Sequence, residues 1–121
     1  MGRKQMFVDC WVSEAAINPY RICKYGAAEG GVVQAAAATD KFLGIGNNLG
    51  ASASGQRTDI VRGGIAEVEY GGTVAAGDWL TSDANGKAIA TTTAGNRIIG
   101  IADVGGVSGD IGLCLITFGK I

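Results

Sequence analysis

Trp79-Leu-Thr-Ser-Asp-Ala-Asn85-Gly86-Lys-Ala-Ile-Ala90 is the stretch that decides the fold class of this chain. Asn-Gly between two short apolar segments is the strongest local signal for a β-hairpin, because both residues accept a positive φ angle. We therefore predict a tight β-hairpin with its turn at Asn85-Gly86. Gly-Gly at 71–72 and Gly-Asp at 77–78 predict turns shortly before it.

Short apolar runs separated by glycine make up most of the remaining sequence, and none of them is sustained at helical spacing. In the run 65–70 apolar and acidic residues alternate, which places one set on a core and the other in solvent. Ala66, Val68 and Tyr70 are expected to face the core, with Glu67 and Glu69 outside. The pattern predicts an all-β fold, a compact β-sandwich or barrel of short strands.

A weak internal repeat relates two parts of the chain. Segments that begin at Gly31, Phe42 and Asp59 recur at Gly86, Ile98 and Asp110, with offsets of 55, 56 and 51 residues. Duplicated strand-turn-strand units would give a compact fold with internal pseudo-symmetry. Chance similarity between short apolar runs is the alternative.

The run 111–118, Ile-Gly-Leu-Cys-Leu-Ile-Thr-Phe, is apolar at both alternating sets of positions. Such a strand is expected to be covered on both sides, by a sandwich interior or by a subunit interface. The chain is 47% hydrophobic and only 17% charged, which also favours contact with another chain.

The N-terminal segment differs from the rest because it has few turn glycines. We expect residues 1–24 to form an extended arm or first strand, and residues 25–121 a single β-domain, since 121 residues suit one core. Large apolar side chains in such a segment often anchor interfaces, although they could equally complete the local core. The candidate partner-binding residues are Lys4, Met6, Phe7, Trp11, Tyr20 and Arg21.

The chain contains no histidine, which removes Ser-His-Asp triads, Cys-His dyads and most zinc sites. Asp78 and Asp83 flank Trp79 and could form a carboxylate pair beside a stacking platform for a sugar. The stronger expectation is that both carboxylates accept hydrogen bonds from turn amides. The sequence therefore predicts no catalytic residue, no enzyme activity, no cofactor and no metal site.

Cysteine content, charge and hydropathy bound the remaining classes of partner. Cys10, Cys23 and Cys114 form an odd set without Cys-x-x-Cys spacing and are expected to be reduced and buried. A net charge of −1 without a basic cluster argues against direct nucleic-acid binding. No apolar run approaches the roughly 18 residues that cross a bilayer, so we expect a soluble protein with no membrane contact.

Four blocks of the sequence, taken in order, resemble the capsid decoration or cement proteins of tailed phages. They begin at Asn18-Pro-Tyr-Arg, Asp59-Ile-Val-Arg, Gly71-Gly-Thr-Val and Ile98-Ile-Gly-Ile, and the likeness covers roughly residues 15–118. The most specific block is Gly71-Gly-Thr-Val-Ala-Ala-Gly-Asp, with Leu-Thr-Ser-Asp-Ala-Asn-Gly-Lys-Ala following it. The first fifteen residues match least.

The resemblance implies a structural virion protein on the outer capsid surface, synthesised in the host cytoplasm. It would be a homotrimer that bridges major capsid protein subunits, with no catalytic residues. A phage tail or baseplate protein is one alternative. A carbohydrate-binding or host-surface-binding β module that uses Trp79, Tyr70, Asp78 and Asp83 is another.

Overall fold

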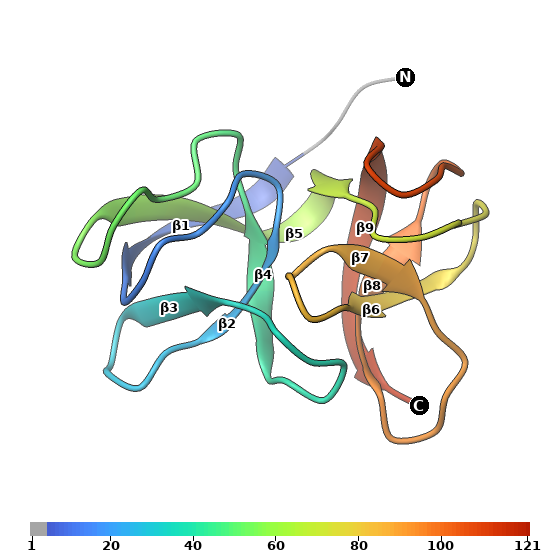
Figure 1. Ribbon diagram of the computed structural model, residues 1–121, viewed down its shortest axis with the longest axis horizontal. Helices are drawn as coiled ribbons and strands as arrows, with labels where there is room; N and C mark the ends of the chain where they lie inside the picture. The colour runs from blue at the N-terminus through green and yellow to red at the C-terminus, as the bar shows by residue number, and fades with distance from the viewer. Residues whose placement is uncertain (1–4) are drawn as a thin grey trace.

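The computed structural model describes residues 5–121, with side chains from residue 8 onward. These residues form nine strands and no helix, which confirms the all-β prediction. Figure 1 shows two lobes side by side, with β1–β4 in one and β6–β9 in the other. The strands are β1 (Gln5–Ser13), β2 (Ile22–Tyr25), β3 (Gly31–Gln34), β4 (Phe42–Gly46), β5 (Arg57–Glu69), β6 (Trp79–Ser82), β7 (Ala88–Ala90), β8 (Arg97–Ala102) and β9 (Ile111–Lys120).

The N-terminal lobe is a closed five-stranded barrel. Its strands lie in the order β1-β3-β2-β4-β5, and the antiparallel pairing of β1 with β5 closes the circle. Closure between β1 and β3 is short, because only Val12 and Ser13 of β1 pair with β3. The barrel interior is filled by Ile17, Cys23, Val32, Leu43, Ala51 and Ile60, with Trp11 packed against them.

The C-terminal lobe continues from the second part of β5, through β9, β8 and β6 to β7. A parallel bridge between Tyr70 and Ala88 links β7 back to the chain just after β5. Ala66, Val68 and Tyr70 lie in the core of this lobe, as their alternation predicts. Glu67 and Glu69 differ from the prediction, because both are only partly exposed. Glu69 is held by two basic side chains at the seam between the lobes.

The C-terminal lobe repeats the strand pairing of the N-terminal barrel. β2 pairs with β3 and β4, and β4 with β5; in the same way, β6 pairs with β7 and β8, and β8 with β9. Ile17 and Ala51 exchange two backbone hydrogen bonds, and so do Val74 and Gly106. The parallel contact between β1 and β3 recurs at the bridge after β5. The strand arrangement thus repeats, with Phe42 equivalent to Ile98 as predicted. The other two predicted correspondences are wrong in register: Gly86 is equivalent to Gly30 and not to Gly31, and Asp59 is equivalent to Leu113 and not to Asp110.

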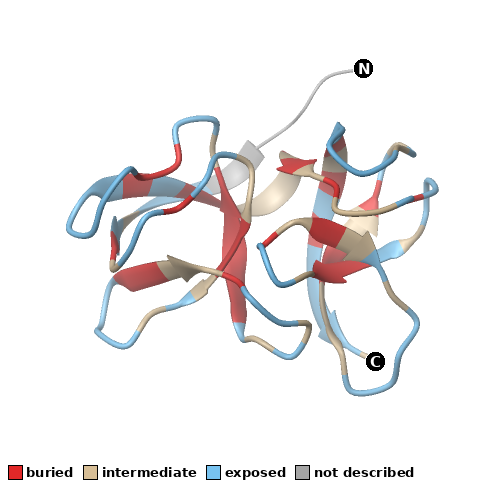
Figure 2. Ribbon diagram, viewed as in Figure 1, coloured by how far each residue is buried: buried red, intermediate tan, exposed pale blue. Residues whose placement is uncertain are grey.

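β4 is the strand on which the two lobes meet. All five of its residues are buried, and Figure 2 shows this strand in red between the lobes. Leu43 packs into the interior of the N-terminal barrel, whereas Phe42 and Ile45 belong to a second cluster that includes the core of the C-terminal lobe. The lobes therefore share a hydrophobic core and are not independent units.

The hairpin predicted at Asn85-Gly86 is present as β6 and β7, but its turn is longer than predicted. Only Gly86 has a positive φ angle, 74°, and Asn85 does not. Asp83 N–H donates to the Lys87 carbonyl at 2.9 Å, so three residues lie inside the turn. A type I turn followed by a left-handed glycine fits this arrangement better than the two-residue turn that we predicted. The Asp83 carboxylate accepts hydrogen bonds from Asn85 and Lys87 N–H, as expected for a turn acid.

The segment predicted as an arm or first strand forms a strand from Gln5 onward. β1 pairs with β5 from Gln5 to Val12, and β2 runs across the boundary that we expected between residues 24 and 25. The extended part of the chain from residue 5 is thus built into the barrel wall.

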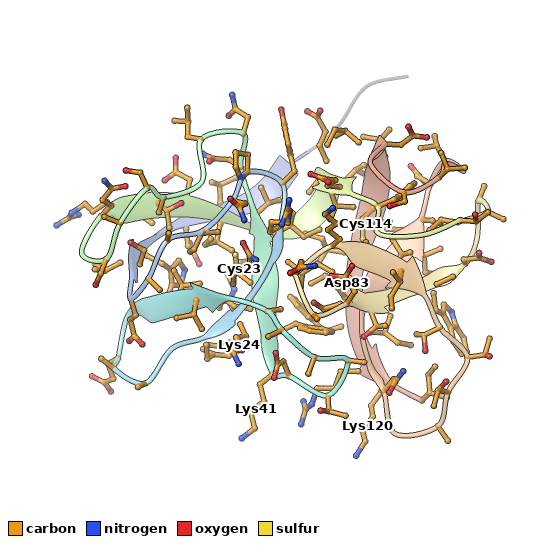
Figure 3. The ribbon with its side chains drawn as sticks, in the orientation of Figure 1. Cys23, Lys24, Lys41, Asp83, Cys114 and Lys120 are labelled. Atoms are coloured by element: carbon orange, nitrogen blue, oxygen red, sulfur yellow. The ribbon has the colours of Figure 1, made fainter. Side chains whose placement is uncertain are left out.

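The cysteine prediction is right at two positions and wrong at the third. Cys23 and Cys114, labelled in Figure 3, are buried, and burial raises the pKa of each thiol to about 12. Cys10 is exposed because it lies on the outer face of the barrel wall. All three thiols are free, as expected.

We predict that Gly44→Ala and Gly100→Ala each destabilise the protein by about 1–3 kcal/mol. These glycines occupy equivalent places in β4 and β8, where a Cβ would collide with the backbone carbonyls of Val61 and Leu115. Urea denaturation measures the effect. Gly119→Ala is the matched control, because a Cβ there meets nothing within 4 Å. A loss at Gly119 as large as at Gly44 would contradict the steric explanation.

Candidate functional site

An ion-pair network crosses the seam between the two lobes. The Arg21 guanidinium lies 3.3 Å from the Glu69 carboxylate, which also lies 3.1 Å from the Lys87 ammonium. Arg21 donates a further hydrogen bond of 2.9 Å to the Asn85 carbonyl in the β6–β7 turn. Glu69 thus fastens the turn of the C-terminal lobe to the start of β2.

The pKa of Glu69 reflects two opposing effects. Burial raises the pKa of this carboxyl, but the hydrogen bonds and positive charges of Lys87 and Arg21 outweigh burial and lower it overall from its ordinary value of 4.5. The network therefore stabilises the folded state at pH values above the ordinary pKa of glutamate. This stabilisation is lost as the pH falls through the lower pKa that Glu69 has in the folded state.

Trp11, one of the predicted partner-binding residues, lies at one end of the N-terminal barrel. Its ring meets Tyr25 edge-on with centroids 5.9 Å apart, and the Arg62 guanidinium lies 5.6 Å from the Trp11 ring centroid. Arg62 also donates to the Tyr25 hydroxyl at 2.9 Å and to the Leu43 carbonyl at 3.2 Å. This cluster closes the barrel end by cation–π and hydrogen-bond contacts.

The other predicted partner-binding residues fall in two groups. Tyr20 adopts a left-handed backbone, with φ of 60°, just before Arg21 of the seam network. Lys4 lies outside the described residues, and so do the side chains of Met6 and Phe7. The structure thus brings Tyr20 and Arg21 to the seam but not to the barrel end at Trp11. Their role as partner contacts stays a prediction.

A basic hollow of about 400 Å³ lies between the lobes and was not predicted. Three basic side chains line it, and the described lining contains no acid. Lys120 lies at the edge of the molecule in Figure 3. The hollow escapes sequence reasoning because its basic residues come from three strands far apart in the chain. Its lining residues are Tyr25, Phe42, Arg62, Arg97, Ile98, Phe118, Gly119 and Lys120.

The predicted sugar-binding alternative is not assembled. Tyr70 is fully buried, and its hydroxyl donates to the Val104 carbonyl at 2.6 Å. Asp78 accepts a hydrogen bond from Ala75 N–H, and Asp83 serves its own turn. Only Trp79 of the four side chains presents a large exposed surface, with 47% of it accessible. The turn-capping expectation for the two aspartates is therefore confirmed.

Neither a metal cluster nor a spanning helix stands out in the part of the chain that the structure describes. In residues 5–121 no group of three histidine, cysteine, aspartate or glutamate side chains is placed to hold a metal ion. The same residues include no helix that is long and apolar enough to cross a membrane.

The fold of this chain is similar to that of a solved phage protein. It resembles the N base of the head fiber protein gp8.5 of bacteriophage phi29, with a TM-score of 0.68 and 16% sequence identity over 95% of this chain and 97% of that one. At this identity the likeness concerns the fold alone. Comparison with curated proteins finds no match.

The family follows from the sequence itself. The family model described as phage cement protein matches residues 13–110, a span that includes strands of both lobes. The chain belongs to the phage cement protein family, as its resemblance predicts, and is a structural component of a phage virion.

We predict that Glu69→Gln destabilises the protein by about 1 kcal/mol at neutral pH. The difference from the wild type should vanish in acid, below the lowered pKa of Glu69, because the protonated carboxyl resembles an amide. Urea denaturation over a range of pH values measures both. Glu29→Gln, in the exposed turn before β3, is the control. An equal loss for Glu69→Gln at all pH values would contradict an ionic role.

Proposed function

We propose that this protein decorates the outer surface of an expanded phage capsid and bridges major capsid protein subunits. The observation that carries the proposal is the family match, which extends through both lobes. Bridging subunits requires extended contact area rather than a reactive centre, so the protein has no enzymatic role and needs no cofactor. Many modest contacts repeated by the symmetry of the shell would give high avidity.

The exposed apolar side chains support a role in contacts. Large apolar side chains are exposed on strands of both lobes. Single exposed apolar residues are common on protein surfaces, but several on neighbouring strands indicate an interface. The basic hollow between the lobes adds a place for an acidic segment of a capsid protein at Arg97 and Lys120, whereas Arg62 already lies 3.6 Å from the Asp9 carboxylate. The exposed large hydrophobic residues on strands are Val8, Val12, Tyr25, Trp79, Ile111, Leu115 and Phe118.

The N-terminal residues belong to the proposed capsid contact. Lys4, Met6 and Phe7 precede the part of β1 that carries the exposed Val8. Trp11, Tyr20 and Arg21 are proposed as further partner contacts, Trp11 at the barrel end and the other two at the seam. The proposed partners are the major capsid protein and further copies of this chain, as a homotrimer, without direct contact to nucleic acid or membrane. Synthesis takes place in the host cytoplasm.

We expect the purified protein to bind expanded capsids and to raise the temperature at which they lose their DNA. Contacts that bridge neighbouring subunits stabilise the bound shell by mass action. Co-sedimentation measures binding, and heating of decorated and bare capsids measures stabilisation. Absence of binding, or equal heat resistance of bare and decorated capsids, would overturn the proposal. A few copies at one vertex rather than hundreds on the shell would indicate a tail or baseplate protein.

We predict that Met6→Ser and Phe7→Ser together weaken capsid binding by at least about tenfold, because buried apolar anchors carry most of the energy of an interface. Co-sedimentation at varied protein concentration measures the change. Val107→Ser is the control, because Val107 lies in the loop before β9 and is 55% exposed. Unchanged binding of a folded double variant would remove the N-terminal residues from the contact.

A further inference from the structure

The duplication allows each surface of one lobe to be compared with its equivalent on the other. In the N-terminal barrel, β1 pairs with β5 at Val8–Val61 and Val12–Arg57. In the C-terminal lobe, β5 pairs with β9 in the same register at Ile65–Leu115 and Glu69–Ile111. The end of β5 therefore corresponds to β1, and the start of β9 corresponds to the start of β5. In the same way Ile22 pairs with Ile45 as Trp79 pairs with Ile101.

The outer face of the N-terminal barrel carries an apolar row across four strands. Val8, Val61, Ile45 and Ile22 are successive partners in the sheet. The last three are at most 1% exposed, because the C-terminal lobe covers them. This row is the hydrophobic part of the contact between the lobes.

The equivalent row on the C-terminal lobe is uncovered. Ile65, Leu115, Ile101 and Trp79 are successive partners across β5, β9, β8 and β6. Leu115 is 40% exposed and Trp79 is 47% exposed, whereas their equivalents Val61 and Ile22 are buried. We call this row the open face. It includes Leu115 of β9, the strand that we expected from its sequence to be covered on both sides.

A polar feature accompanies the covered row in the N-terminal barrel. The tip of the β6–β7 turn lies against the start of β2: Gly86 carbonyl accepts from Ile22 N–H at 2.8 Å, and Asn85 carbonyl accepts from the side chains of Arg21 and Gln34. Ala35 N–H donates to the Ile22 carbonyl at 2.8 Å beside this turn. The turn thus fills a receptor made of β2 and the end of β3.

The equivalent receptor on the C-terminal lobe is a hollow. Thr91 N–H donates to the Trp79 carbonyl at 2.9 Å, as Ala35 does to Ile22. A hollow of about 480 Å³ lies there, and a second of about 280 Å³ lies along the open face on the other side of Trp79. The first is lined by Gly77, Asp78, Trp79, Ala90, Thr91 and Thr92.

The equivalent of the inserted turn is exposed on the N-terminal barrel. It is the β2–β3 turn, residues 26–30, and Gly30 has the same φ of 74° as Gly86. The Glu14 carboxylate accepts hydrogen bonds from Ala27 and Ala28 N–H at 2.8 and 2.9 Å, so the turn is held in shape. These backbone bonds lower the pKa of Glu14. Each molecule therefore presents an unfilled counterpart of the receptor, in which Asp78 and Ala90 stand in place of Arg21 and Gln34. It also presents a related turn, which encloses four residues where the β6–β7 turn encloses three.

We propose that copies of this protein associate head to tail, with the β2–β3 turn and adjoining barrel of one copy seated on the open face and Trp79 hollow of the next. The contact repeats between chains the packing that already joins the lobes within one chain. Two different surfaces meet, so the interface is heterologous, and a ring forms where the rotation closes. The inference specifies the self-association proposed above and does not depend on capsid binding.

Sedimentation velocity over a range of concentrations tests the association. The wild type is expected to form oligomers, and Trp79→Asp and Leu115→Asp to raise the dissociation constant by at least about thirtyfold. Both positions are exposed, so the variants should fold, which circular dichroism and thermal melting verify. Leu49→Asp, at a 78% exposed loop residue away from the open face, is the control. A monomeric wild type, or full association of both folded variants, overturns the proposal.

A mixing experiment tests the head-to-tail arrangement. Ala28→Arg blocks the turn and Leu115→Asp blocks the open face, so each variant alone should remain monomeric. Their mixture retains one intact pair of surfaces and should form a heterodimer, with no larger species. A mixture that stays monomeric overturns the arrangement. Capsid binding is measured separately, so a failure of the decoration role is distinguishable from a failure of self-association.

Discussion

β5 is the element on which the rest of the structure depends, because one continuous strand of 13 residues serves both lobes. Its first part pairs with β1 and β4, and its second part pairs with β9. A strand shared in this way removes any flexible linker and sets the angle between the lobes. The C-terminal lobe can then cover the apolar outer face of the N-terminal barrel. The equivalent surface of the C-terminal lobe, the open face, stays exposed.

In both repeated turns a carboxylate accepts hydrogen bonds from turn amides, although the β2–β3 turn encloses four residues and the β6–β7 turn three. In the N-terminal barrel the acid is Glu14 beside β1, and Gly26 leaves space for its carboxylate. In the C-terminal lobe Gly71 stands at the place equivalent to Glu14, and the acid is Asp83 at the place equivalent to Gly26. An acid and a glycine have exchanged positions while a carboxylate still satisfies the turn amides.

The parts of the fold that could be predicted are those with local causes. The hairpin between Trp79 and Ala90, the core side of Ala66 and Val68, and the turn roles of the aspartates all follow from nearby residues. The Asn85 φ angle was not predictable, because a one-residue change in turn length alters which residues take the left-handed region. The exposure of Cys10 and the pairing of Glu69 depend on strands distant in sequence.

The sequence by itself determined that this is an all-β chain of short strands, since alternation and turn residues act over a few positions, whereas the repeat of the strand arrangement was settled only by the tertiary structure. Its family resemblance was also readable in the sequence. Only the tertiary structure decided that Arg62 closes a barrel with Trp11 and that Ile45 is covered whereas Ile101 is not. Equivalent residues in the two halves have similar local sequence preferences. Their burial differs because the C-terminal lobe packs onto the outer face of the N-terminal barrel, whereas no described residue covers the equivalent face of the C-terminal lobe.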